Sequence, residues 1–395
     1  MTPSRDSSGH DVALYGTTGV LGREVKTNLE VEHEGIGRFT AVANNRSAGQ
    51  EIRWRGVSSP VLGPLDVDAS SVDFAILAIP ADAASREAPR LLDAGARIID
   101  LSGALAMPPL PRALKTPAPL VWPSLSSAKA VDWDLEVAVA LPSATSSTLA
   151  PLLDALTAAA SIGTLPQLAS VDVTALLSAS NAGREGVEAL SRQAVGLLNY
   201  RPVVDPRPFP ATLAFNNIAP PTEEVVVFAD RTAAELRRLV PALGDARVEV
   251  FPIWVPAFSG LTLSVTLHFA AAVPPEALRK AIAAHPDLAF DMPEVDPPDE
   301  DPDTDALELE PVDGDDLDFD PDDAASVAAI ASEPTPVPEG GLDLRGLLER
   351  GDVRASTPLI SGTTARLVLM ANPIERTALA ATSLLVRWMA ALDAD

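Results

Sequence analysis

A glycine-rich turn near the start of the chain constrains its fold more than any other feature. The apolar run at 11–16 (DVALYG) predicts a buried strand, and apolar residues at helical spacing predict a helix from Val20 to Leu29. The turn between them reads Gly16, Thr17, Thr18, Gly19, Val20, Leu21, Gly22. Glycines in this context let the backbone approach a pyrophosphate at a helix N-terminus. We therefore predict that these seven residues bind a dinucleotide; the alternative is a turn that only closes the helix against the strand.

Strands and helices alternate after this turn. Apolar runs at 39–43, 73–79 and 97–101 predict strands, and 85–94 predicts a helix. The hydrophobicity of the strands is continuous, which is typical of a parallel sheet covered on both faces. The sequence therefore predicts an α/β protein that begins with a Rossmann-like domain.

The pattern changes beyond about residue 141. Strands are expected at 168–178, 224–228, 247–253, 261–270 and 364–371, and helices at 147–160, 187–198, 232–239, 275–284 and 374–392. Strands in long runs indicate an α+β domain with a mixed sheet. We assign 1–140 and 361–395 to the dinucleotide-binding domain, and 141–290 and 341–360 to the second domain.

The charge of the chain is concentrated in one segment. The formal net charge is −26, and 17 Asp and Glu residues lie between Asp291 and Asp323 with no Lys or Arg among them. Such a composition predicts that 291–340 is a disordered acidic insertion, either a solubilising segment or a tether for a basic protein partner. The remainder is mildly acidic, which argues against a nucleic-acid partner. Nothing resembles an EF-hand spacing, so no metal is expected.

Apolar runs of strand length predict no membrane helix, and the N-terminus lacks an apolar signal core. The chain has no cysteine, which excludes disulfides, Fe–S clusters and thiolate zinc sites. We expect a cytoplasmic protein.

The segment after the second predicted strand indicates which cofactor is preferred. It reads NNRSAG at 44–49, with no acidic residue to bind a free ribose 2′-hydroxyl. Arg46 and Ser47 suit a 2′-phosphate instead, which favours NADP over NAD. The alternative is a solvated arginine in a turn.

A series of segments, in order, resembles the aspartate-β-semialdehyde dehydrogenase family. They are GTTGVLG (16–22), NNRSAG (44–49), ARIIDLSGALAM (96–107), PLVWP (119–123), SNAGREG (180–186), AFNNIAP (214–220), VPAFSG (255–260) and ANPIERTA (371–378). The resemblance implies enzymes that use NADP to interconvert an acyl phosphate and an aldehyde. It also implies a homodimer formed through the second domain, and a cofactor contact from Asn372.

The chemistry of that family requires a thiolate, an acid/base histidine and two arginines that bind the substrate's phosphate or carboxylate. The resemblance places Ala144 at the thiolate position, Leu261 at the histidine position, and Ala106 and Trp254 at the arginine positions. It therefore predicts no catalytic residue. Arg184, Trp254 and Ala106 would line a substrate-like pocket, in which Arg184 is either an anion ligand or part of a salt bridge.

Three functions remain open at this point. The favoured one is a non-catalytic member of the family that binds NADP and forms a homodimer. The second is an active NADP-dependent oxidoreductase on another substrate. The third is an interaction scaffold without a ligand.

Overall fold

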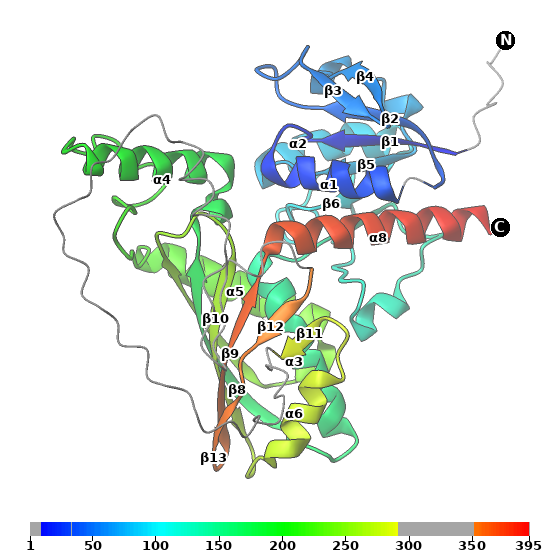
Figure 1. Cartoon of the computed structure of the whole chain (residues 1–395). Coiled ribbons are helices and arrows are strands. Elements are labelled where there is room, and N and C mark those ends of the chain that lie inside the picture. Colours follow the sequence, from blue (N-terminus) through cyan, green and yellow to red (C-terminus); the bar gives the residue numbers. More distant parts are fainter. Residues whose placement is uncertain (1–8, 33, 291–350, 395) are drawn as a thin grey trace, which may run out of the picture.

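The computed structural model describes residues 9–32, 34–290 and 351–394. The chain is built around two large β-sheets, one in the upper part of the view and one in the lower part (Figure 1). The acidic insertion predicted at 291–340 lies outside the described residues.

The first sheet has five parallel strands in the order β2-β1-β5-β6-β7. The strands are β1 (His10–Tyr15), β2 (Ile36–Val42), β5 (Phe74–Leu77), β6 (Arg97–Asp100) and β7 (Ala138–Ala140). Its helices are α1 (Val20–Val31), α2 (Ala81–Asp93) and α8 (Pro373–Asp393). Strand β5 is entirely buried, as its continuous apolar sequence requires. The predicted Rossmann-like parallel sheet is confirmed.

A small hairpin that the sequence pattern did not predict follows β2. Strands β3 (Glu51–Trp54) and β4 (Val57–Pro60) pair antiparallel. Trp54 stacks on Phe39 of β2 with ring centroids 4.0 Å apart, which anchors the hairpin to the sheet. Short 3-10 turns elsewhere span Pro64–Asp66, Ala69–Ser71, Ser126–Ala130, Ala179–Ala182 and Pro241–Leu243.

The second sheet is mixed and has seven strands, in the order β11-β12-β14-β10-β8-β9 with β13 beside β14. The strands are β8 (Leu168–Leu177), β9 (Arg247–Trp254), β10 (Leu261–Phe269), β11 (Leu288–Phe290), β12 (Val353–Ala355), β13 (Leu359–Ser361) and β14 (Thr364–Ala371). The pairs β8–β9 and β11–β12 are parallel, and the other pairs are antiparallel. The predicted mixed sheet is confirmed. Strand β14 lies in this sheet, so the assignment of all of 361–395 to the first domain is corrected for 361–371.

Within the described residues, four helices belong to the second domain: α3 (Ala144–Ser161), α4 (Gly183–Leu198), α5 (Thr222–Leu239) and α6 (Pro275–Ala283). Helix α3 contacts β8, β10 and β14 as well as α5, α6 and α8. The strand predicted at 224–228 is wrong, because these residues form the first half of α5. The run of β-branched valines favoured a strand locally, but the acidic residues Glu223 and Glu224 suit the N-terminus of a helix that packs on β9.

Helix α8 connects the two domains. It lies beside α1 of the first domain (Figure 1) and also contacts α3. The buried guanidinium of Arg376 donates hydrogen bonds to the carbonyl of Gly351 (2.7 Å), the carbonyl of Ser147 (3.2 Å) and a carboxylate oxygen of Asp287 (3.2 Å). One side chain of α8 therefore fixes the first turn of α3 and the two strands that flank 291–350.

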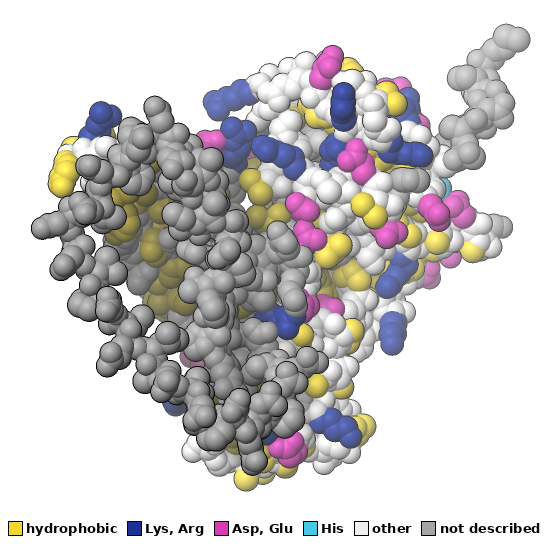
Figure 2. Space-filling model, viewed as in Figure 1, with side chains coloured by type: hydrophobic (Ala, Val, Ile, Leu, Met, Phe, Trp, Pro, Cys, Tyr) yellow, Lys and Arg dark blue, Asp and Glu magenta, His cyan; other side chains and the backbone are white. Residues whose placement is uncertain are grey.

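The visible surface of the first domain carries cationic and anionic side chains interspersed with one another (Figure 2). No continuous basic surface is present on this face outside the part covered in grey. Over the described ranges, no helix combines the length and apolar character needed to cross a bilayer.

Candidate functional site

A cavity of about 650 Å³ lies where the two domains meet. Its walls come from the glycine turn, from the loops after β5 and β6, and from the starts of α3, α4 and α8. The lining residues are Gly19, Val20, Leu21, Ala78, Ile79, Pro80, Leu101, Pro142, Ser143, Ala144, Ser180, Asn181, Ala182, Gly183, Arg184, Pro373, Ile374 and Thr377.

The N-terminal ends of five helices converge on this cavity: α1, α2, α3, α4 and α8. Each helix start carries the positive end of a helix dipole. Arg184 is the only charged residue among those lining the cavity. The field in the cavity therefore favours an anionic ligand.

The three glycines of the turn have different roles. A Cβ on Gly16 would lie 2.2 Å from the carbonyl oxygen of Ala78, and one on Gly22 would lie 2.1 Å from the carbonyl oxygen of Gly16. These two glycines are required for the close packing of α1 on the sheet. Gly19 caps α1 and lines the cavity, and a Cβ there would approach only the Gly16 oxygen, at 3.2 Å. Only Gly19 leaves open a space that a pyrophosphate would fill.

The polar residues of the predicted cofactor site also divide into two groups. Thr17 is buried, and its hydroxyl donates to the carbonyl of Leu14 (2.6 Å) while accepting from Val42 N–H (3.2 Å), so it joins β1 to β2. Thr18 instead donates to Ser47 Oγ at 3.3 Å, which brings the turn and the 44–49 segment together. Arg46 is exposed, and within the described residues its guanidinium has no ion-pair or hydrogen-bond partner.

Val20 and Leu21 line the cavity beside Gly19. Asn372 caps α8: its Oδ1 accepts from Ile374 N–H at 3.2 Å and from Glu375 N–H at 3.5 Å. Asn372 is outside the lining itself, but Pro373 and Ile374 directly after it are part of that lining.

The position predicted for a nucleophile lies in the same cavity. Ala144 is the first residue of α3 and lines the cavity. Ser143 caps the helix, with its Oγ accepting from Ser146 N–H at 3.4 Å. A thiolate at residue 144 would be stabilised by the helix N-terminus, whereas the methyl group of alanine offers neither a nucleophile nor a hydrogen bond.

The four remaining predicted residues are separated by the fold. Arg184 lines the cavity, and its Nε donates to Glu188 Oε1 at 2.6 Å within α4. Ala106 and Leu261 are buried in the main core, outside the cavity lining. Trp254 packs edge-to-face on Phe209, with ring centroids 5.2 Å apart, and also lies outside the lining. Of these four, only Arg184 therefore reaches the cavity.

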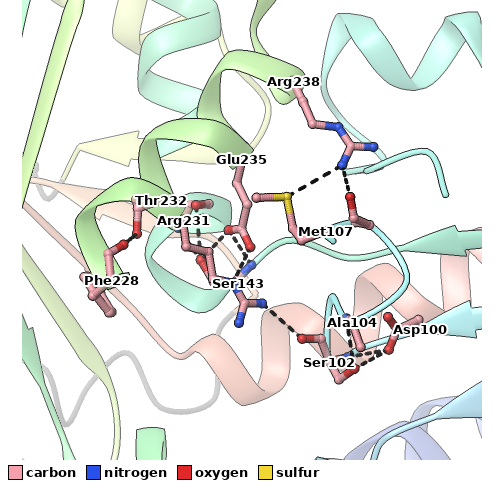
Figure 3. Close-up of polar contacts among 12 residues, drawn as sticks. Asp100, Ser102, Ala104, Met107, Ser143, Phe228, Arg231, Thr232, Glu235 and Arg238 are labelled. Carbon is pink, nitrogen blue, oxygen red and sulfur yellow. Dashed lines mark hydrogen bonds and ion pairs between the residues drawn. The ribbon is translucent and has the colours of Figure 1, made fainter. Parts of the chain in front are cut away.

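A buried carboxylate that sequence reasoning missed lies behind Ser143 (Figure 3). Glu235 of α5 is fully buried, and its Oε2 accepts from Ser143 Oγ at 2.6 Å and from Ser143 N–H at 3.0 Å. Its Oε1 accepts from Arg231 Nε at 2.9 Å. Arg231 and Glu235 stand four residues apart on α5, a spacing typical of an ion pair, but the predicted helix began only at residue 232. That spacing alone did not show that the pair would face residue 143.

Helix α5 also holds the loop that contains Ala106 (Figure 3). Arg231 donates to the carbonyl of Ser102 at 3.0 Å, and Arg238 donates to the carbonyls of Ala106 and of Ala118 (2.7 Å). At the start of this loop, Asp100 accepts from Ser102 N–H and Leu105 N–H, both at 2.8 Å. Burial raises the pKa of Asp100, and the hydrogen bonds from Ser102 and Leu105 oppose that shift.

None of the described histidines lines the cavity. His10 bonds to Asp393, His268 bonds to Asp172 on the second sheet, and His285 is buried near Asp154. Burial lowers the pKa of His285, with Asp287 and Asp154 opposing the shift. The fourth histidine, at position 33, lies outside the described residues.

Comparisons with known families divide the chain near residue 150. The semialdehyde dehydrogenase NAD-binding domain matches residues 11–150, and the semialdehyde dehydrogenase dimerisation domain matches residues 150–309. The "USG-1 protein homolog" of Pseudomonas aeruginosa is 34% identical over 286 residues, covering 69% of this chain and 78% of that protein. An "Aspartate-semialdehyde dehydrogenase" of Campylobacter jejuni is 24% identical over 274 residues, covering 67% and 74%.

Solved structures show the same fold. A probable aspartate-semialdehyde dehydrogenase from Pseudomonas aeruginosa superimposes with a TM-score of 0.73 at 24% identity, covering 96% of this chain and 98% of that one. An aspartate semialdehyde dehydrogenase with NADP from Candida albicans superimposes with a TM-score of 0.60 at 14% identity, covering 97% and 98%.

Proposed function

This chain belongs to the semialdehyde dehydrogenase family, and we propose that it is a homodimeric NADP-binding member that has lost the family's thiolate-dependent dehydrogenation. One observation carries this proposal. Gly19 and Ala144 line the same cavity, so a backbone that fits a pyrophosphate lies opposite a methyl group where a thiolate is required. Without the thiolate, no thiohemiacetal and no thioester form at residue 144.

The residues that would hold the cofactor come from three segments. Gly19, Val20 and the N-terminus of α1 would hold the pyrophosphate, and Thr18, Arg46 and Ser47 would hold the 2′-phosphate. When bound, the nicotinamide supplies a hydride acceptor or donor. The unpaired guanidinium of Arg46 supports NADP over NAD, because a dianionic phosphate gains charge-assisted hydrogen bonds from it.

The second function, an active oxidoreductase on another substrate, has less support. In this family the acid/base group is a histidine, and the position that the resemblance gives it is Leu261, which is buried outside the cavity lining. The match of 150–309 to a dimerisation domain supports the homodimer. A cytoplasmic location remains part of the proposal.

Ligand-dependent melting tests cofactor binding. We expect millimolar NADP to raise the melting temperature of the full chain, and NAD to raise it less, because a ligand that binds only the folded state stabilises it. Gly19→Val should remove both shifts, since a branched side chain would fill the space at the N-terminus of α1. Gly196→Val is the matched control: Gly196 lies in α4, away from the cavity, and should keep both shifts. A folded native chain that shows no shift with either nucleotide would leave the interaction scaffold as the better interpretation.

A further inference from the structure

Ser143 and Glu235 place a hydroxyl and a base beside Ala144, the position predicted for a thiolate. Ser143 lines the cavity, whereas Glu235 is fully buried behind it. The 2.6 Å separation between Ser143 Oγ and Glu235 Oε2 is short for an O–H···O bond and is typical of a hydroxyl that donates to a carboxylate. A serine hydroxyl becomes a useful nucleophile when such a base lies next to it.

The carboxylate is held in one orientation. Arg231 Nε binds Oε1 at 2.9 Å, and Ser143 N–H binds Oε2 at 3.0 Å. The remaining contact of Oε2 is the Ser143 hydroxyl itself. Ser146 Oγ, which is also buried, lies 3.1 Å from Ser143 Oγ and is a second possible acceptor for that hydroxyl. The shorter distance to Glu235 Oε2, 2.6 Å, favours donation to the carboxylate.

The start of α3 supplies the remaining requirement, a group that stabilises an oxyanion. The first three N–H groups of a helix lack intrahelical partners. Ser146 N–H is capped by Ser143 Oγ, while the N–H groups of Ala144 and Thr145 form no hydrogen bond within the described part of the chain. Ala144 lines the cavity, whereas Thr145 is buried and outside the lining, so the N–H group of Ala144 is the donor that can serve an oxyanion there.

We propose that Ser143 is a nucleophile activated by Glu235, and that this chain hydrolyses esters of small apolar acids through an acyl-serine intermediate. Ser143 Oγ attacks the ester carbonyl carbon while its proton passes to Glu235, and the carbonyl oxygen becomes an oxyanion at the start of α3. The oxyanion collapses, the bond to the alcohol oxygen breaks, and Glu235 returns the proton to the departing alcohol. Water then attacks the acyl carbonyl carbon while its proton passes to Glu235. The bond to Ser143 Oγ breaks, Glu235 returns the proton to Ser143 Oγ, and the acid is released.

The cavity wall indicates the class of acyl group. Most of its side chains are apolar, with Val20, Leu21, Ile79, Leu101 and Ile374 among them. A short aliphatic or aromatic acyl group would be desolvated against this surface. The step needs neither the cofactor nor a thiolate, so it is independent of the proposed function.

Labelling of the full chain with a fluorophosphonate probe tests the proposal. We expect one adduct by intact mass, located at Ser143 by peptide mapping, and turnover of p-nitrophenyl acetate by the native chain. Glu235→Gln should slow labelling by about 100-fold or more, since it removes the base. Ser143→Asn should abolish labelling and lower ester turnover at least about tenfold, while an asparagine still caps α3.

Ser126→Ala is the matched control. Ser126 Oγ also donates to a carboxylate, that of Asp154 at 3.0 Å, but Ser126 is outside the cavity lining. This variant should be labelled and should turn over ester at the native rate. The proposal is overturned if the folded native chain gains no adduct, if the adduct maps to another residue, or if Ser143→Asn, shown to be folded by a cooperative melt, hydrolyses ester as fast as the native chain. The native chain is itself a test, so an unstable variant does not leave the question open.

Discussion

The two ends of the interdomain cavity differ in whether they retain the features that the family's chemistry requires. At the end formed by α1, the backbone is as open as a phosphate requires: Gly19 has no side chain and faces the cavity. At the end formed by α3, Ala144 stands at the position predicted for a thiolate, and the neighbouring Ser143 is hydrogen-bonded to a buried carboxylate. Both ends are starts of helices with the same favourable dipole.

This difference shows that binding and chemistry depend on different parts of a site. Binding of an anion at a helix start relies on backbone N–H groups and on the absence of a side chain, so it survives most substitutions nearby. Covalent chemistry relies on one atom of one side chain, so a single substitution removes it. Substitutions at the α1 end should therefore change cofactor binding, whereas substitutions at the α3 end should change stability or chemistry.

The largest expected effect is at the α3 end. Glu235→Ala leaves Ser143 N–H, the Ser143 hydroxyl and Arg231 Nε without their shared acceptor, so we expect a loss of about 2–4 kcal/mol in the free energy of unfolding. Glu249→Ala is the control, because its ion pair with Arg247 (3.0 Å) is exposed and should contribute no more than about 0.5 kcal/mol. Denaturant unfolding measures both. Equal losses in the two variants would show that the buried contacts of Glu235 contribute no more to the free energy of unfolding than an exposed ion pair does.

The next effect separates structural glycines from the binding glycine. Gly22→Ala places a Cβ 2.1 Å from the Gly16 carbonyl oxygen, and we expect it to cost roughly 2–3 kcal/mol of stability. Gly19→Ala meets the same oxygen at 3.2 Å and should cost less than about 1 kcal/mol. Thermal melts without nucleotide compare the two. If Gly19→Ala were the more destabilising variant, the open space assigned to the pyrophosphate would not exist.

A smaller effect is expected on cofactor choice. Arg46→Ala removes a guanidinium that would give a 2′-phosphate charge-assisted hydrogen bonds, each worth about 1.5–3 kcal/mol. The ratio of the dissociation constants for NAD and NADP should therefore fall by about tenfold or more, with NAD affinity unchanged. Arg53→Ala, at an exposed position on the neighbouring strand β3, should leave that ratio unaltered. A preference that survives Arg46→Ala would place the 2′-phosphate elsewhere.

The smallest effect concerns the helices that meet above the cavity. Burial, followed by a hydrogen bond and repulsion from Glu24 of α1, raises the pKa of Glu375 in α8 to about 7. The folded state then binds more protons at Glu375 than the unfolded state does between about pH 4.5 and 7, so the contribution of this group to stability is present below that window and is lost as the pH rises through it.

Glu375→Gln removes this titration. We expect it to raise the melting temperature by a few degrees at pH 8 and to have little effect at pH 4. Glu223→Gln, on the surface of α5, should show no such dependence on pH. The same melting temperature for Glu375→Gln and the native chain at both pH values would contradict the shared proton between α1 and α8.

Local sequence patterns predicted much of the fold but little of the contact chemistry. Continuous apolar runs predicted the parallel strands, because a strand buried on both faces requires an apolar residue at nearly every position. The valines at 225–227 gave a wrong strand, since their β-propensity was outweighed by the packing of α5 on β9.

The site shows the same limit. The spacing of Gly16, Gly19 and Gly22 predicted the turn, but the different roles of these glycines depend on which atoms lie opposite each one. Similarly, Glu235 reaches Ser143 across 92 residues of sequence, a contact that no local pattern encodes.

The most direct test compares binding and turnover in one sample of the full chain. NADP is titrated by calorimetry, and NADPH formation is then followed by absorbance with aspartate semialdehyde and phosphate present. We predict saturable binding of NADP and no phosphate-dependent NADPH above a blank without protein, because Ala144 has no thiolate to form the thioester. Turnover on the order of 1 per second, within the ordinary range for enzymes, would contradict the loss of the family's chemistry. No binding of NADP by folded protein would contradict the retained cofactor site.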